Sequence, residues 1–255
     1  MSATLPSWMR FAAPVGVGVI IVALWFLIVD VLHAAPRALP SPVAIIDELV
    51  IHSDIILEDM GITGSNALIG LLAGTLVAIV LAALAATARP IDGMLAPLVA
   101  AIAVVPIVAI TPILNTMFGA SSQFGREAVA AIAAFVPVFV NVLRGLRQTR
   151  PVHRDLLRAS GASGLQTFRV LTLPTALPYL LTGLRIASSI AVIAALVAEY
   201  FGGPADGIGT AIASYAKSGH AALAFAYVAG GIVIGLVFFL VTSLLERIVT
   251  RRSPV

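Results

Sequence analysis

The chain has 255 residues, of which 60% are hydrophobic and only 11% are charged. This composition excludes an ordinary soluble protein, and apolar runs of about 20 residues favour membrane-spanning helices over barrel strands, in which apolar and polar residues alternate. The net charge of +3 does not indicate nucleic-acid binding, because the basic residues collect at the ends of the apolar runs. We therefore expect an all-α polytopic membrane protein in which residues 1–255 form a single transmembrane domain.

Two predicted spans occupy the first third of the chain. Residues 11–32 are long enough to cross a hydrocarbon core of about 30 Å, and without a convincing cleavage pattern they read as a retained span. Residues 43–60 are amphipathic and acidic, which predicts a helix on the outer membrane surface. The second span covers residues 62–88. Its Gly70 and Gly74 permit close approach of another helix, although we favour ordinary packing without a special partner.

Four further spans are predicted in the rest of the chain. Residues 91–118 contain three prolines, so we expect a broken helix whose freed carbonyls face protein or a water-filled path. The fourth, fifth and sixth spans are predicted at residues 126–146, 174–201 and 221–245. A short helix at residues 208–215 is predicted in the loop before the last span, which brings the expected number of transmembrane helices to six.

The only long polar segment lies between the fourth and fifth spans, at residues 151–174. Its first part, residues 152–160, has apolar residues at helical spacing and predicts a short amphipathic helix outside the bilayer. Gly161 and Gly164 allow a change of direction, and Pro174 is a natural start for the next helix. Such a segment is suited to docking against another protein.

The spacing within this segment resembles the EAA loop of ABC importer permeases. That pattern is Glu-Ala-Ala, three residues, Gly, nine residues, Ile, one residue, Leu-Pro, and here the same spacing joins Asp155-Leu156-Leu157, Gly161, Leu171 and Leu173-Pro174. The sequence Leu39-Pro40-Ser41-Pro42 after the first span is similar to the nitrate, sulfonate and taurine branch of these permeases.

The resemblance implies a type I importer permease in which residues 151–174 form the cytoplasmic coupling loop. It also implies a second permease subunit, identical or different, two cytoplasmic ATPases that carry ATP and Mg²⁺, and an extracytoplasmic solute-binding protein. This chain itself then needs no cofactor. The residues expected to couple to the ATPase are Arg154, Asp155, Leu156, Leu157, Arg158, Gly161, Leu171, Leu173 and Pro174.

The distribution of basic residues predicts the orientation, because cytoplasmic segments retain Lys and Arg. Eleven basic residues fall on the side of the central loop and both termini, against three on the other side. We therefore expect both termini and the coupling loop to lie in the cytoplasm, with the chain in a bacterial cytoplasmic membrane. The eleven residues are Arg10, Arg89, Arg144, Arg147, Arg150, Arg154, Arg158, Arg169, Arg247, Arg251 and Arg252.

Catalytic and metal-binding patterns are absent from the sequence. The only lysine, Lys217, is not in a P-loop, the chain has no cysteine, and its four histidines form no ligand motif, so we expect no enzyme activity and no metal site. A secondary transporter or a channel remains the alternative, although the middle of the spans carries few of the paired charges that ion coupling requires.

A transport path would run between the third and fifth spans, where polar residues are few. Serine and threonine in membrane helices usually bond a carbonyl of an earlier turn, which is the simpler interpretation for most of them. A small anionic or polar solute, such as a sulfonate, taurine or nitrate, is the expected cargo, but the sequence does not specify it. The candidate path residues are Thr111, Asn115, Ser188, Ser189 and Glu199.

Overall fold

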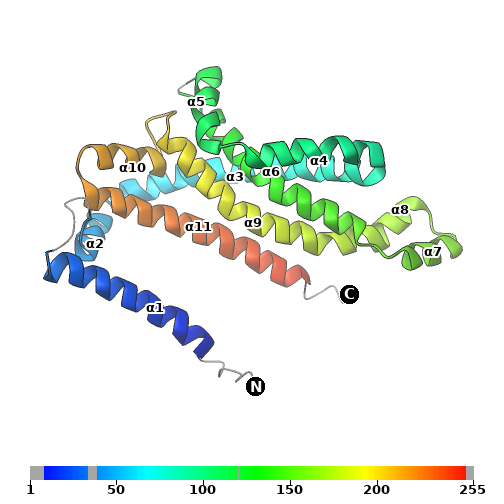
Figure 1. The fold of residues 1–255 in the computed structure, drawn as a ribbon, viewed down its shortest axis with the longest axis horizontal. Helices are drawn as coiled ribbons and strands as arrows, with labels where there is room; N and C mark the ends of the chain where they lie inside the picture. The colour runs from blue at the N-terminus through cyan, green and yellow to red at the C-terminus, as the bar shows by residue number, and fades with distance from the viewer. Residues whose placement is uncertain (1–8, 34–38, 120, 251–255) are drawn as a thin grey trace.

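A computed structural model describes residues 9–33, 39–119 and 121–250, and within these ranges it contains helices and connecting turns but no strand (Figure 1). The N-terminal helices are α1 (Met9–Phe26), the π-helical turn η1 (Leu27–Val31), α2 (Pro42–Ile51), α3 (Ser53–Thr87), α4 (Arg89–Val104) and α5 (Ile107–Phe118). They are followed by α6 (Phe124–Arg147), α7 (Pro151–Ala159), α8 (Gly164–Thr167), the π-helical turn η2 (Phe168–Thr172), α9 (Leu173–Tyr200), α10 (Ile208–Lys217) and α11 (Ala221–Thr250).

Four helices are long and apolar enough to cross a membrane: α3, α6, the continuous helix from Gly164 to Tyr200, and α11. The pair α4 and α5 adds a fifth span if the two are counted together, and the first expected span appears as the shorter apolar stretch Val15–Val31. The described residues therefore contain an apolar helix at each of the six expected spans, although only four have full length without a break.

The predicted surface helix at residues 43–60 is divided in two. The separate helix α2 begins after Ser41, whose hydroxyl accepts a hydrogen bond from Ala44 N at 3.1 Å, and it ends before His52. Residues from Ser53 onward belong to α3, so the prediction of a single helix over residues 43–60 was wrong. The interruption lies at His52, whose φ of −107° and ψ of 20° are not helical, and both Ile45 of α2 and Ile56 of α3 are buried in the core.

The third span is broken as the prolines predicted. Helix α4 ends at Val104, Pro106 precedes the first residue of α5, and the two helix axes meet at 94°. Proline cannot donate the backbone hydrogen bond that would continue the helix. The last turn of α4 instead closes with a bond between residues three apart, from Val105 N to Ile102 O at 3.3 Å. In Figure 1, α4 lies along the bundle and α5 turns away from it.

Helices α3, α6 and α9 form the core of the bundle. A side chain at Gly70 or Gly74 of α3 would collide with Ala130 or with the backbone of Ala131 on α6. Likewise, a Cβ at Gly183 of α9 would lie 3.0 Å from Asn141 of α6. The interpretation of Gly70 and Gly74 as ordinary packing without a special partner was therefore wrong, because both lie in a close helix contact.

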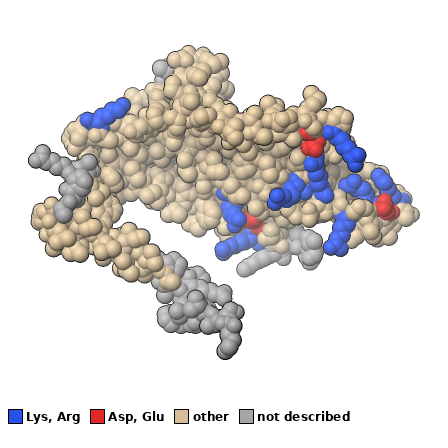
Figure 2. All heavy atoms as spheres, in the orientation of Figure 1, with Lys and Arg blue, Asp and Glu red and all other residues tan. Residues whose placement is uncertain are grey.

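Most basic side chains gather at one end of the bundle. In Figure 2, most of the visible Lys and Arg lie at the end that carries α7 and α8 and at the end of α11, whereas the long side in view is almost free of charge. Arg147 at the end of α6 pairs with Asp92 in the first turn of α4 at 2.8 Å, so this end is also held by an ion pair. Such a distribution fits helices that expose apolar sides to lipid.

Candidate functional site

The predicted coupling segment projects from the end of the bundle as helix α7 (Figure 1). None of its residues is buried: Val152 and Leu156 are exposed, the latter by 64%, and Leu157 is half-buried. Arg158 lies 4.0 Å from Asp155, and Arg154 donates a hydrogen bond to Thr149 at 2.8 Å. An amphipathic helix whose apolar side chains contact little of its own chain is suited to bind a partner.

Two local features define the shape of this segment. Gly161 follows α7 with φ +77°, a conformation that favours glycine, and no atom lies within 4 Å of the place where a Cβ would be. The next helix begins with a capping box, in which the Ser163 hydroxyl accepts from Gln166 N at 3.3 Å and the Gln166 side chain accepts from Ser163 N at 2.7 Å. A sharp, fixed turn therefore separates the two helices.

The second half of the segment differs from the sequence prediction. Pro174 does lie in the first turn of α9, but the chain is already helical from Gly164, because α8 and η2 lead into α9 without a break. The π-helical turn ends at Thr172, where Leu173 N donates to Phe168 O, and Pro174 follows in the first turn of α9. Leu171 and Leu173 thus lie on one helix that reaches from the coupling segment to the opposite end of the molecule.

Polar contacts join α9 to α11 near this end. Glu246 of α11 accepts a hydrogen bond from Thr182 at 2.6 Å and pairs with Arg185 at 3.1 Å. About one turn further along each helix, the hydroxyls of Ser188 and Thr242 lie 3.0 Å apart. Because these groups lie between two apolar helices, they fix the register of α11 on α9.

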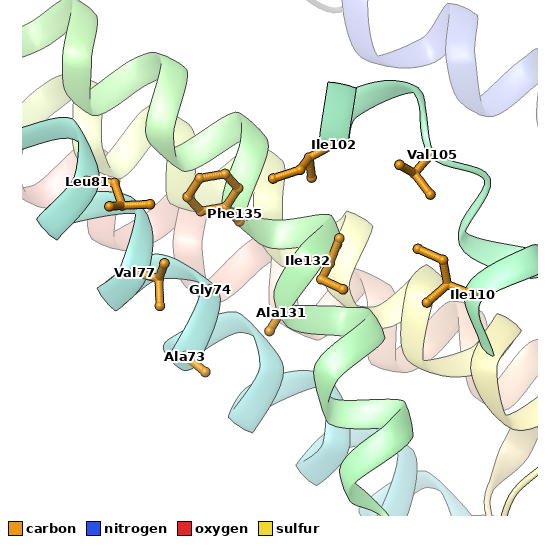
Figure 3. Close-up of a pocket in the computed structure, with 10 residues that line it drawn as sticks. All are labelled: Ala73, Gly74, Val77, Leu81, Ile102, Val105, Ile110, Ala131, Ile132 and Phe135. Atoms are coloured by element: carbon orange, nitrogen blue, oxygen red, sulfur yellow. The ribbon is translucent and has the colours of Figure 1, made fainter. Parts of the chain in front are cut away.

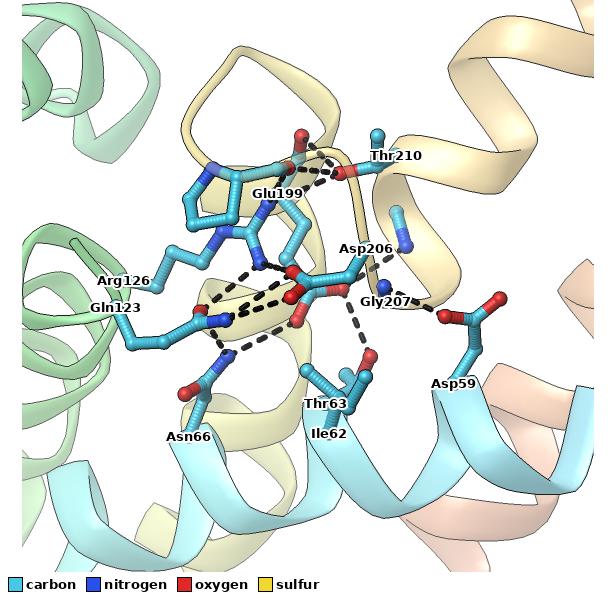
Figure 4. Close-up of polar contacts among 12 residues, drawn as sticks. Asp59, Ile62, Thr63, Asn66, Gln123, Arg126, Glu199, Asp206, Gly207 and Thr210 are labelled. Carbon is cyan, nitrogen blue, oxygen red and sulfur yellow. Dashed lines mark hydrogen bonds and ion pairs between the residues drawn. The ribbon is translucent and has the colours of Figure 1, made fainter. Parts of the chain in front are cut away.

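At the opposite end, a buried polar network surrounds Arg126 (Figure 4). The Arg126 side chain is 0% exposed and pairs with Asp206 at 2.6 Å. It also donates to Pro204 O at 2.6 Å, to Thr210 at 3.0 Å and to Gln123 at 3.0 Å. One arginine from the first turn of α6 therefore holds the turn before α10 and the first residues of α10 itself.

Glu199, near the end of α9, belongs to the same network. Its carboxylate accepts hydrogen bonds from Thr63 at 2.8 Å, from Asn66 at 3.3 Å and from the backbone N–H of Gly209 at 2.9 Å. Asp59 of α3 accepts from Gly207 N at 2.8 Å. These contacts tie α3, α9 and α10 together, so Glu199 stabilises the packing of three helices in this conformation.

The candidate path residues occupy different environments. Ser188 is buried and donates to Arg185 O at 2.8 Å, and Thr111 is buried and donates to Ile107 O at 3.1 Å, as expected for hydroxyls in membrane helices. Ser189 is half-buried on the next position of α9. Asn115 is buried, and neither of its side-chain polar atoms has a partner among the described residues. The structure therefore does not gather the five residues into one site.

An apolar cavity of about 390 Å³ lies beside the broken span (Figure 3). Its walls come from the middle of α3, from α6, and from the residues on both sides of the break between α4 and α5. Val105 and Ile110 line it from the break, and Phe135 lines it from α6. The break is therefore not tightly packed, which leaves room for α4 and α5 to change their angle.

Sequence reasoning did not identify the network around Arg126. A weak signal was present: Thr63 and Asn66 are polar, three residues apart in an apolar run, and such spacing places both on one helix face. Their partners Gln123 and Glu199 lie far away along the chain, so no local pattern reveals the pairing. Across the described ranges, no three His, Cys, Asp or Glu side chains come together as a metal-holding group.

Comparison with known proteins gives a consistent picture. Residues 68–253 match the family model described as the inner membrane component of binding-protein-dependent transport systems. A probable ABC transporter permease of Haemophilus influenzae is 28% identical over 78% of this chain and 81% of its own. The formylaminopyrimidine transport permease ThiX of Halalkalibacterium halodurans is 33% identical over 66% of this chain and 67% of its own.

A wider alignment and a solved structure agree with these matches. The putative aliphatic sulfonates transport permease SsuC of Bacillus subtilis is 27% identical over 91% of this chain and 83% of its own. The crystal structure of an amino acid ABC transporter with histidines matches the fold with a TM-score of 0.59 at 16% identity, covering 80% of this chain and 95% of that one. The family match spans most of the chain and joins the membrane helices to the coupling segment, and the chain therefore belongs to the binding-protein-dependent transport system inner membrane components.

Proposed function

We propose that this chain forms the translocation path of an ATP-driven importer for a small polar or anionic solute and receives the ATPase stroke through α7. Two permease subunits, two cytoplasmic ATPases and an extracytoplasmic solute-binding protein complete the assembly, and ATP and Mg²⁺ are held by the ATPases. The observation that carries the proposal is the exposed apolar face of α7 in a chain of this family.

Docking of α7 has a simple energetic basis. Val152 and Leu156 are exposed on a helix that leaves the bundle, and burial of one such side chain contributes about 1.5–3 kcal/mol. Arg154 and Arg158 lie on the same short helix and are suited to acidic groups at the rim of an ATPase groove. Gly161 then fixes the direction in which α7 projects.

Helix α9 transmits the movement of the ATPases to the membrane-spanning helices. Because α8, η2 and α9 form one continuous helix, movement of the coupling loop displaces α9 directly. Close glycine contacts join α9 to α6 and α6 to α3, so the three move together, and the break at Pro106 absorbs the change. The path lies between this unit and α4–α5, with Thr111, Asn115, Ser188, Ser189 and Glu199 as the polar residues nearest to it.

The orientation follows from the same arrangement. The end with α7 and most of the arginines is cytoplasmic, as are both termini, and the network around Arg126 lies at the outer end. The solute-binding protein therefore docks near α10 and the turn before it. A secondary transporter or a channel needs no ATPase, and this difference separates the alternatives in an experiment.

Two matched glycine substitutions test the proposal. Gly161→Glu and Gly219→Glu both place a side chain at positive φ, +77° and +82°, and neither position has an atom within 4 Å of the added Cβ. The local strain is thus comparable, but Gly161 lies in the coupling segment and Gly219 lies between α10 and α11. Co-purification of the ATPase should be lost with Gly161→Glu and retained with Gly219→Glu, and ATP-dependent uptake should be lost with Gly161→Glu. Equal co-purification with both variants, or normal uptake by Gly161→Glu, would show that α7 does not couple the two subunits.

A further inference from the structure

The side chain of Asn115 is an unexplained polar group in an apolar surrounding. It lies near the end of α5, is 8% exposed, and has both its Oδ1 and Nδ2 atoms without a partner among the described residues. One turn earlier on the same helix, Thr111 satisfies its hydroxyl with Ile107 O. Native proteins seldom leave a buried amide unpaired, and where they do, the group often serves another state or a ligand.

A second unpaired group lies against the same stretch of backbone. A Cβ at Gly202 would be 3.1 Å from Asn115 Nδ2, and a Cβ at the next residue, Gly203, would be 3.0 Å from Nε of Arg126. This Nε is buried and also lacks a partner within the described chain, although the rest of the guanidinium is fully bonded. Gly125 also packs against the amide, because a Cβ added at Gly125 would lie 2.6 Å from Asn115 Oδ1.

The Gly202–Gly203 turn separates this polar group from an outer pocket. The pocket has a volume of about 350 Å³, and Gly202, Gly203 and Thr210 are among its lining residues. The turn has φ +141° and +105°, angles that other residues rarely adopt, and it carries no side chain that blocks the way.

The charges around the turn select the kind of solute. Three carboxylates, those of Asp59, Glu199 and Asp206, belong to the connected network, and only one guanidinium, that of Arg126, lies among them. Lys217, which lines the outer pocket, adds a second cation. Carboxylates thus outnumber cations, which disfavours an anion. An amide presents a donor beside an acceptor, and it pairs best with a neutral group of the same kind.

We propose that Asn115 contacts the transported solute at the outer end of the path and selects neutral solutes with an adjacent hydrogen-bond donor and acceptor, as in an amide, ureide or lactam. This inference rests on the proposed function, since it assigns the cargo of the same path. In the described conformation the site is closed by Gly125 and by the Gly202–Gly203 turn.

The test uses the full chain in lipid nanodiscs, alone and with its ATPase, and measures retention of uracil and of methanesulfonate by equilibrium dialysis. Wild-type protein should retain uracil at least about tenfold better than methanesulfonate, and Asn115→Leu should reduce uracil retention by about tenfold or more. Thr116→Val, at the next position of α5, is the matched control and should leave retention unchanged, because the exposed Thr116 hydroxyl donates only to Ile113 O of its own helix.

Thermal unfolding of the same samples distinguishes a solute contact from a structural role. Asn115→Leu removes an unpaired buried amide, so the unfolding temperature should rise while uracil retention falls. The inference is overturned if wild-type protein retains methanesulfonate to the same extent as uracil, or retains neither probe. It is also overturned if Asn115→Leu retains uracil normally or has a lower unfolding temperature than wild-type protein. Failure of the ATPase to join the nanodiscs would instead count against the proposed function, because the retention measurement does not depend on it.

Discussion

Arg126 is a buried side chain that contacts both the outer turn and α10, and its removal should release both. Arg126→Met keeps the length and the apolar stem of the side chain but removes the guanidinium that pairs with Asp206 and bonds Pro204 O. Removing one partner of a buried ion pair costs about 3–5 kcal/mol. Asp206 is 38% exposed and regains water, so we expect the lower limit, about 3 kcal/mol of local stability.

This loss can be measured as the rate at which α10 lifts from the bundle. The chain has no cysteine, so Ala213→Cys introduces a single buried thiol on α10 whose labelling by a soluble reagent requires local opening. A loss of about 3 kcal/mol predicts that Arg126→Met increases the labelling rate by about a hundredfold.

The matched control is Arg147→Met, because Arg147 forms an ion pair of similar length, 2.8 Å, but with 47% and 31% of the two side chains exposed. Such a surface pair contributes at most about 1 kcal/mol, and its loss at the other end of the molecule should leave Ala213→Cys labelling unchanged. A change of less than threefold with Arg126→Met, or an equal change with Arg147→Met, would refute the view that Arg126 holds α10.

Three further predictions concern packing, coupling and orientation. Gly74→Leu should prevent the contact of α3 with the Ala131 backbone and lower the unfolding temperature in detergent, whereas Gly235→Leu, with no atom within 4 Å, should be neutral; similar unfolding temperatures would contradict the packing argument. Leu156→Asp should abolish ATPase co-purification without lowering thermal stability, because Leu156 is exposed, while Asp155→Glu should be tolerated; binding that survives Leu156→Asp would remove α7 from the interface. Single cysteines at Ser2, Asp155 and Ser253 should resist impermeant thiol reagents in intact cells and one at Ser53 should react, and the reverse pattern would overturn the orientation.

The sequence predicted the parts of the fold that depend on local pattern. The broken third span was readable from Pro106, and the short helices α7 and α10 were readable from the spacing of their apolar residues. The division at His52 was missed because residues 43–60 are amphipathic on both sides of it, and a buried isoleucine lies on each side, Ile45 before it and Ile56 after it.

The long-range contacts could not be predicted from the sequence, for a physical reason. Thr63 and Glu199 are separated by 136 residues, and neither residue type specifies its partner. Gly70 and Gly74 showed that a close contact was permitted, but the partner Ala131 is small and leaves no signal in the sequence. Residues that meet through tertiary packing therefore had to be found in the structure.

The unbroken helix from Gly164 to Tyr200 has a consequence for timing. Its 37 residues span about 55 Å, so one rod begins beside α7 and ends at the network around Glu199. The helix is unbroken but contains the π-helical turn Phe168–Thr172 and the internal Pro178, so movement of one end displaces the other unless the helix bends at these positions. Under the proposed function, closure of the ATPases and loosening of the outer network are therefore coupled, and an intermediate in which only one end has moved requires such a bend.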